Sequence, residues 1–216
     1  MLFRKKKAYC RNTALEAAAA ARARGKSKKA IAEYMKVLCV DPADHAVHGK
    51  VAPLLAASGG HDEAWKSFQA AAEGYIKEGF HEKAVGVYTQ AARLMPKRIE
   101  VWEAIAGLQM ERNLRADAVN TLFKAHRCFT GRKTRDTAIG LLRKAFAIAP
   151  WHFEVTYELA RLLARAGNKE EALRFYEGLA ARSRGMHLRR IRSAIMKLSP
   201  SPVTAWRWLR AAFSGV

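Results

Sequence analysis

Small and bulky apolar residues recur along this chain with a period of 54 residues. Three matching segments run from an alanine to a proline twelve positions later: AIAEYMKVLCVDP from Ala30, AVGVYTQAARLMP from Ala84 and AIGLLRKAFAIAP from Ala138. The match continues past the prolines at the triplets Val47/Val101/Val155, Ala52/Ala106/Ala160, Leu54/Leu108/Leu162 and Ala64/Ala118/Ala172. A fixed period of this kind predicts a stacked-repeat fold, in which no unit buries its apolar face alone. Function is therefore expected on a long repeated surface rather than in one catalytic pocket.

Within each period the apolar spacing is helical. Val101, Ile105 and Leu108 recur near the 3.6-residue period, and Asn113 follows where the helix should end. Because glycine accepts the left-handed backbone that ends a helix, equivalent helix ends are expected at Gly25, Gly59-Gly60, Gly79 and Gly167. The pattern predicts short helices joined by tight turns, and no segment has the sustained two-residue alternation of a strand.

These residues resemble the tetratricopeptide repeat, a 34-residue pattern of two helices. In the stretch from Ile99, Trp102, Ile105 and Ala106 match the first helix, and Ala118, Leu122 and Ala125 match the second. Similar sets begin near His45 and Phe153, with matching positions at His48, Val51, Ala52, Ala64, Phe68, Ala71, Thr156, Leu159, Ala160, Ala172 and Tyr176. The resemblance implies an all-α fold, a right-handed helical-repeat solenoid of helix-turn-helix repeats with a 54-residue super-repeat.

The spacing departs from the family pattern in one respect. The alanines that open second helices fall at positions 30, 64, 84, 118, 138 and 172, so the spacing alternates between 34 and 20 residues. We therefore expect residues 61–78 to form one helix that closes one repeat and opens the next, and a helix at about 115–129 to do the same. Each 54-residue period should then contain three helices rather than four.

Positive charge is concentrated at both ends of the chain, whose net charge is +20. Residues 1–40 carry +9, residues 41–131 are neutral and residues 132–216 carry +11, with no acidic residue after Glu177. We expect a basic N-terminal tail at 1–11, a repeat domain at 12–181 and a basic C-terminal segment at 182–216. In that segment Trp206, Leu209 and Phe213 share one helix face, which is expected to cap the last core surface. Docking of this segment to an acidic partner or to a membrane surface is the alternative.

The remaining chemistry argues against an enzyme. Cys10, Cys39 and Cys128 are far apart and odd in number, which predicts small buried thiols rather than disulfides or a zinc site. His45 and His48 lack the further ligands of a metal site. No glycine-rich phosphate loop or serine nucleophile motif occurs, so no catalysis, cofactor or small-molecule substrate is expected. No apolar run reaches the length of a membrane span, and the basic start of the chain is a poor secretory signal. We therefore expect a cytoplasmic location. Peripheral attachment to a membrane-associated assembly is also compatible with the sequence.

The resemblance also suggests a binding surface. In this family the first helix of each repeat usually lines a concave groove that holds an extended peptide or a partner helix. Carried over by position, the groove residues are Asn12, Ala19, Arg22, Lys66, Gln69, Glu73, Glu100, Glu103, Met110, Glu154, Tyr157 and Arg161. Their charges are mixed, so they do not specify a ligand. The first helix reads ALEAAAAARA and lacks the lysines and asparagines with which some members clamp a C-terminal carboxylate.

The basic ends form a second set of candidate binding residues. They are Arg4, Lys5, Lys6, Lys7, Lys26, Lys28, Lys29, Arg182, Arg184, Arg189, Arg190 and Arg192. A basic patch attracts nucleic acid, anionic lipid and acidic protein alike, and it also aids solubility without binding anything. The sequence predicts a non-catalytic adaptor that binds a peptide or helix of a protein partner through the groove or the basic ends. An acidic protein is one such partner. The alternative is a basic protein that binds nucleic acid or an anionic membrane surface.

Overall fold

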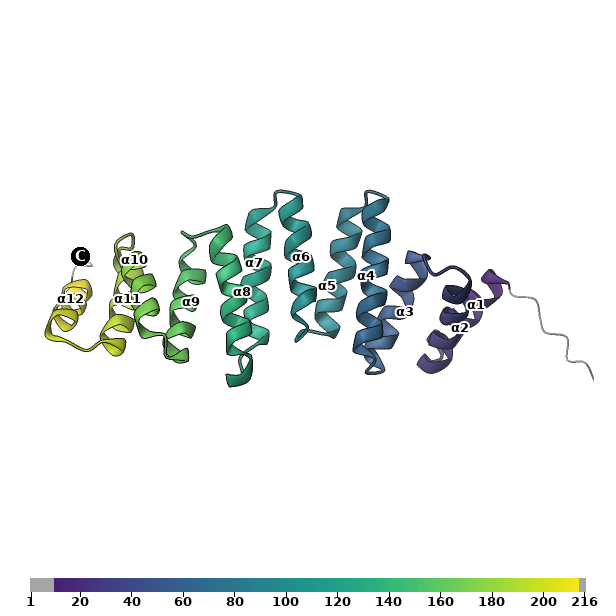
Figure 1. The fold of residues 1–216 in the computed structure, drawn as a ribbon, viewed down its shortest axis with the longest axis horizontal. Coiled ribbons are helices and arrows are strands. Elements are labelled where there is room, and N and C mark those ends of the chain that lie inside the picture. Colours follow the sequence, from purple (N-terminus) through teal and green to yellow (C-terminus); the bar gives the residue numbers. More distant parts are fainter. Residues whose placement is uncertain (1–9, 214–216) are drawn as a thin grey trace, which may run out of the picture. The chain divides into compact units, whose positions relative to one another are not determined.

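The fold is described by a computed structural model over residues 10–213, which form helices joined by short turns (Figure 1). The predicted all-α class is confirmed, and no strand occurs within this range. None of the helices in residues 10–213 has the length and apolar character of a membrane span. The chain divides into two compact units, Met1–Leu108 and Gln109–Val216, which are described separately below.

Helices α1 to α5 pack against one another in succession in the first unit, and α7 to α12 do so in the second. The first unit contains α1 (Arg11–Ala23), α2 (Ser27–Val40), α3 (His45–Ala57), α4 (His61–Lys77), α5 (His81–Leu94) and most of α6 (Ile99–Glu111). The second unit contains α7 (Arg115–Ala125), the short 3₁₀ helices η1 (His126–Cys128) and η2 (Arg132–Thr134), α8 (Arg135–Ile148), α9 (Phe153–Ala166), α10 (Lys169–Ala180), α11 (Gly185–Leu198) and α12 (Pro202–Phe213).

The helices repeat with the period found in the sequence. Ser27, His81 and Arg135 begin α2, α5 and α8, each 54 residues after the last. The same shift relates α3 to α6 and α9, and α4 to α7 and α10, so three helices per period are confirmed. Residues 61–77 form the single helix α4, which packs against both α3 and α5 as predicted. The helix predicted at about 115–129 is shorter than expected, because α7 ends at Ala125 and continues only as η1.

The aligned small residues form the core between the helices. Ala30, Ala84 and Ala138 are each at most 1% exposed. The repeated valines of α3, α6 and α9 are completely buried, and so are the repeated alanines near the start of α4, α7 and α10. These residues are Val47, Val101, Val155, Ala64, Ala118 and Ala172. Small residues let helix backbones approach closely, and Tyr34 and Tyr88 fill the space beside them. The residues that repeat along the sequence are therefore the residues that pack in the core.

A side-chain hydrogen bond recurs at one position of the period. The residue at the fourth position of α3, α6 and α9 bonds the carbonyl of the proline that follows the preceding helix. The three bonds are His48 Nε2 to Pro42 O at 3.0 Å, Trp102 Nε1 to Pro96 O at 3.0 Å and Thr156 Oγ1 to Pro150 O at 3.3 Å. Three different residue types thus satisfy the same backbone carbonyl after each helix end.

The predicted helix ends are also confirmed. Asn113 and the glycines at 25, 59, 79 and 167 all have positive φ angles, so each supplies the left-handed residue that stops a helix. At Gly167 this conformation follows α9 directly as its C-cap.

Two predictions about side-chain burial are wrong. Cys10 and Cys39 are exposed and Cys128 is half-buried, because these residues lie outside the repeated apolar positions. Trp206 is 67% exposed and Leu209 40% exposed, so these two side chains do not cover the core as expected. The Phe213 side chain lies outside the described residues. α12 packs against α11 with Ala211 buried instead, and whether it acts as a cap stays a prediction.

Candidate functional site

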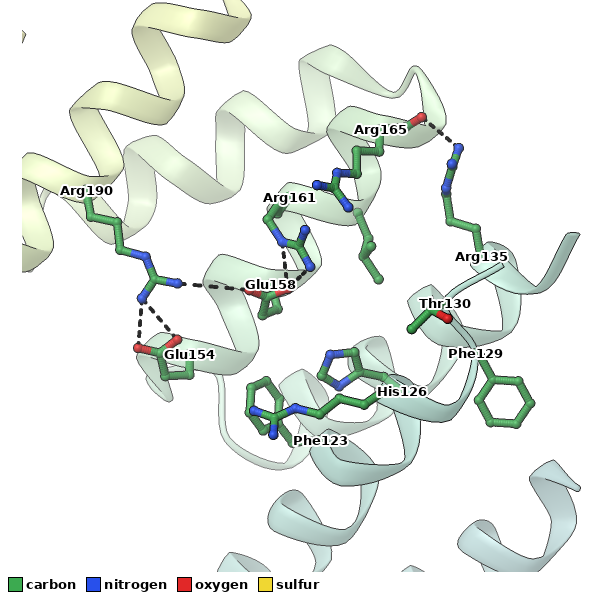
Figure 2. Close-up of a pocket in the computed structure, with 12 residues that line it drawn as sticks. Phe123, His126, Phe129, Thr130, Arg135, Glu154, Glu158, Arg161, Arg165 and Arg190 are labelled. Carbon is green, nitrogen blue, oxygen red and sulfur yellow. Dashed lines mark hydrogen bonds and ion pairs between the residues drawn. The ribbon is translucent and has the colours of Figure 1, made fainter. Parts of the chain in front are cut away.

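A cavity of about 430 Å³ in the second unit collects charged side chains from several elements (Figure 2). Its charged lining consists of Arg127, Arg135, Arg161, Arg165, Arg190, Glu154 and Glu158. His126, Thr130 and a few apolar side chains complete the wall. We call this cavity the arginine pocket.

One face of α9 supplies four of these residues. Glu154, Glu158, Arg161 and Arg165 follow one another at intervals of four, three and four residues, so the helix turns them to the same side. Arg161 donates from Nε to Glu158 Oε2 at 2.7 Å, and its Nη2 lies 2.5 Å from the same oxygen. The Glu158 carboxylate is therefore neutralised within its own helix.

Arg190 reaches the pocket from α11 and engages the other carboxylate. Its Nη1 donates to the two oxygens of Glu154 at 3.0 and 3.2 Å, and its Nη2 lies 4.0 Å from Glu158. Its guanidinium carbon lies 3.9 Å from the centre of the Tyr157 ring, a cation–π arrangement. Desolvation opposes the charged form of Arg190, but Tyr157 and Glu154 outweigh it and raise the pKa. Both carboxylates of the pocket thus have arginine partners.

Two further arginines of the pocket, Arg135 and Arg165, have no carboxylate partner among the described residues. Arg135, at the start of α8, donates from Nη1 to the backbone carbonyl of Arg165 at 2.8 Å. The Arg165 guanidinium has no hydrogen bond or ion pair with any residue in the described part of the chain. Figure 2 shows Arg165, Arg161 and Arg135 around the cavity, with Thr130 below them.

His126 forms part of the pocket wall and is only 8% exposed. Its ring packs 4.8 Å from the ring of Phe123. Burial lowers the pKa of His126, and the charges of Arg127 and Arg161 act in the same direction. A backbone hydrogen bond at Phe123 and the charge of Glu158 oppose this shift but do not outweigh it, so the imidazole is neutral near pH 7. The Nδ1 atom of the ring is buried, so it is the rest of the ring that forms the cavity wall.

The arrangement suits the binding of anions. Five arginines face two glutamates that are already paired, which leaves the cavity with three uncompensated positive charges when His126 is neutral. Guanidinium groups bind carboxylates and phosphates through parallel N–H donors. No three His, Cys, Asp or Glu side chains gather to hold a metal ion in the residues that the structure describes.

The structure brings only one group of the predicted groove residues into this site. Glu154 and Arg161 line it, and Tyr157 lies beside them with only 9% exposure, its ring 5.5 Å from that of Tyr176. The other groove residues lie on α1, α4 and α6. Asn12, Ala19, Arg22, Lys66, Glu73, Glu100 and Met110 are exposed there, and Gln69 and Glu103 are half-buried.

The predicted basic residues are dispersed. Among those that lie in the described part of the chain, Arg190 alone lines the arginine pocket. Lys26, Lys28 and Lys29 are exposed around the start of α2. Arg182 and Arg184 line a second cavity of about 590 Å³ beside Trp151. Arg189 donates a hydrogen bond to the Ala211 carbonyl at 3.0 Å, and Arg192 pairs with Glu177 at 3.0 Å. Arg4, Lys5, Lys6 and Lys7 lie outside the described residues.

Sequence reasoning missed His126, Arg135 and Arg165. They come from three different elements and have no shared motif, and the family pattern places none of them in the groove. The basic run from Arg132 to Arg135 between α7 and α8 is a signal by which Arg135 could have been found.

Residues 131–195 match the family model described as tetratricopeptide repeat. No curated protein matches the chain. Among solved structures, the chain is similar to a tetratricopeptide repeat protein from Parabacteroides merdae, with 15% identity over 95% of this chain and 93% of that one and a TM-score of 0.35. It is similar to PilF of Pseudomonas aeruginosa, with 16% identity over 95% and 93% and a TM-score of 0.32. It is also similar to the Rap conjugation gene regulator of plasmid pLS20 in complex with a peptide, with 14% identity over 96% and 66% and a TM-score of 0.41.

Proposed function

We propose that this protein is a non-catalytic interaction scaffold whose arginine pocket holds an acidic segment of a protein partner. The match of residues 131–195 to the tetratricopeptide-repeat model supports the scaffold role. The observation that carries the proposal is the excess of arginine over glutamate within one cavity. Since Arg161 and Arg190 already neutralise the two glutamates, the free donors of the pocket suit acidic groups of another chain.

The position of the pocket supports the same conclusion. Glu154 and Arg161 are at positions where the family resemblance places the ligand groove, and both line the cavity. Tyr157 and Arg190 hold this face of α9 in place through their cation–π contact. Arg161 and Arg190 are held in place by their ion pairs, so they lose less entropy on binding than flexible surface lysines would.

Binding of a labelled peptide tests the proposal. A fluorescent peptide rich in Asp and Glu should bind the full-length protein, and its Asn/Gln counterpart should not, when fluorescence anisotropy is measured at about 0.15 M salt. Arg165→Gln should weaken binding about tenfold, because it removes a charge-assisted hydrogen bond. Arg174→Gln is the matched control, since Arg174 is also exposed but lies on α10 outside the pocket lining. Equal binding of the two peptides, or equal losses in the two variants, contradicts the proposal.

A second candidate function is favoured by the exposed side chains of α12. Val203, Trp206 and Leu209 lie three residues apart and are 59%, 67% and 40% exposed. Arg207 and Arg210 lie on the same helix, which belongs to a segment without acidic residues. A helix with an exposed tryptophan face and basic neighbours suits the surface of an anionic bilayer. This supports the anionic-membrane alternative over nucleic acid.

Vesicle binding tests this second candidate. Vesicles of phosphatidylcholine with phosphatidylglycerol should sediment the protein at about 0.15 M salt, and pure phosphatidylcholine vesicles should not. Trp206→Ser should reduce binding, whereas Trp151→Ser should leave it unchanged although Trp151 is 74% exposed. If random-sequence RNA binds and neither vesicle does, the nucleic-acid alternative replaces the membrane one.

A further inference from the structure

We infer that the arginine pocket takes a phosphoryl group carried by a side chain of the bound protein segment. The inference rests on the proposed function and specifies the acidic group that the scaffold recognises. Its basis is the number of arginine donors in the cavity that no described carboxylate uses.

The first support is the number of donors. Each guanidinium has five N–H donors, and Arg135 uses one for the Arg165 carbonyl while Arg161 directs two at Glu158. None of the N–H donors of the Arg165 guanidinium is hydrogen-bonded to a residue that the structure describes. Thr130 adds a hydroxyl to the same wall. A phosphoryl group offers three acceptor oxygens in a tetrahedral arrangement and can use donors from several directions, whereas a carboxylate offers two oxygens in one plane.

The second support is charge. The cavity carries three uncompensated positive charges, counting five arginines, two glutamates and a neutral His126. One carboxylate supplies a single negative charge, whereas a phosphoryl group at neutral pH supplies between about 1.5 and 2. The doubly charged group therefore neutralises more of the pocket than an aspartate or glutamate side chain does.

A protein-borne phosphoryl group fits better than a nucleic acid. Nucleic acids present a row of phosphates, and proteins bind them with a track of basic side chains. Here the arginines line one cavity, and the apolar side chains of Phe123 and Leu162 belong to the same lining. Such a setting suits one phosphorylated side chain with its neighbouring peptide residues.

Two small probes test the inference directly. N-acetyl-phosphoserine N-methylamide and N-acetyl-glutamate N-methylamide carry the two competing acids on the same backbone. Binding to the full-length protein should be followed through the imidazole resonances of His126, in a buffer without phosphate. The phosphoserine probe should bind about tenfold more tightly than the glutamate probe, and Arg165→Gln should remove this preference. Arg174→Gln should retain it.

The outcomes separate the inference from the proposed function. If the acidic peptide binds but the phosphoserine and glutamate probes bind equally, the phosphoryl inference fails and the scaffold proposal stands. If the phosphoserine probe binds at His126 but no acidic peptide binds, the site takes phosphoryl groups and the acidic-segment proposal fails. If a single-stranded oligonucleotide displaces the phosphoserine probe with much higher affinity than any peptide, nucleic acid replaces protein as the source of the phosphate and the inference is overturned.

Discussion

At the residue scale, Asp44 combines two stabilising contacts. Its Oδ1 accepts a hydrogen bond from the backbone amide of Val47 at 3.0 Å and so caps α3, and its Oδ2 lies 2.5 Å from Arg11 Nη2. We expect Asp44→Ala to lower the free energy of unfolding by about 1–2 kcal/mol, mostly through the lost cap. Urea unfolding followed by circular dichroism measures this.

The control for this prediction is Asp41→Ala. Asp41 is exposed and accepts from the Ala43 amide at 3.1 Å without capping a helix, so its loss should cost less. Burial acts to raise the pKa of Asp44, but the hydrogen bonds from Arg11 and Val47 outweigh it and lower the pKa. The contribution of Asp44 is therefore present above the ordinary carboxyl pKa of about 3.9 and is lost as the pH falls through the lower folded-state value. A difference between wild type and Asp44→Ala that persists at the acid limit would argue against this origin.

His126 should make stability depend on pH in a different range. Burial lowers its pKa in the folded protein, and a backbone hydrogen bond at Phe123 and the charge of Glu158 oppose this without reversing it. Arg127 and Arg161 lower the pKa further. As the pH falls below about 6.5, the unfolded chain takes up the proton first, so stability decreases from there down through the lowered folded-state pKa. The His126→Gln variant should show a shallower decrease in the midpoint of urea unfolding between neutral and mildly acidic pH. The same slope in both proteins would mean that other groups cause the dependence.

At the element scale, Gly74 permits the close approach of α4 to α3. A Cβ atom at this position would collide with the Cβ and Cγ atoms of His45, which lie near the backbone and cannot move away cheaply. We expect Gly74→Ala to reduce the free energy of unfolding by about 1–3 kcal/mol, because overpacking exceeds the gain in helix propensity. Equilibrium unfolding in urea gives the value.

Gly86 in α5 provides the matched substitution. Nothing lies within 4 Å of a Cβ built there, and the preceding period has Ala32 at the equivalent position. Gly86→Ala should therefore stabilise the protein by about 0.5–1 kcal/mol, because alanine loses less backbone entropy than glycine in a helix. If both substitutions stabilise, α3 and α4 can separate more easily than the contact at Gly74 implies.

The hydrogen bonds to the three prolines show how far a pattern predicts an element. The period identified His48, Trp102 and Thr156 as equivalent although their side chains are unrelated. Their shared role became visible only from the bonds that each makes to a proline carbonyl. A sequence pattern shows which residues occupy equivalent positions. It does not show which side-chain donor reaches a given acceptor.

At the scale of the whole molecule, the net charge of +20 should control the response to salt. Like charges repel in the folded state, and salt screens this repulsion. Exposed ion pairs such as Arg143–Glu171 at 2.7 Å contribute only up to about 1 kcal/mol each and are screened as well. We expect the midpoint of thermal unfolding to rise by a few degrees between about 0.05 and 0.5 M sodium chloride. A fall over this range would show that the ion pairs outweigh the repulsion.

The sequence by itself determined the helices, their period, their ends and the small residues between them. These properties are local: the 3.6-residue spacing selects the buried face, and Asn113 and Gly167 accept the backbone conformation that stops a helix. It also identified Glu154 and Arg161 as candidate binding residues through the family resemblance.

Only the tertiary structure decided which charges meet. His126, Arg135, Arg165 and Arg190 belong to four different elements. They line one cavity because α8 packs on α9, α9 on α10 and α10 on α11. Periodicity could not foresee this, since it indicates which face of a helix is buried but not which distant side chain it contacts. The outward position of Trp206 has the same origin, because an apolar spacing predicts a helix face and packing decides what that face covers.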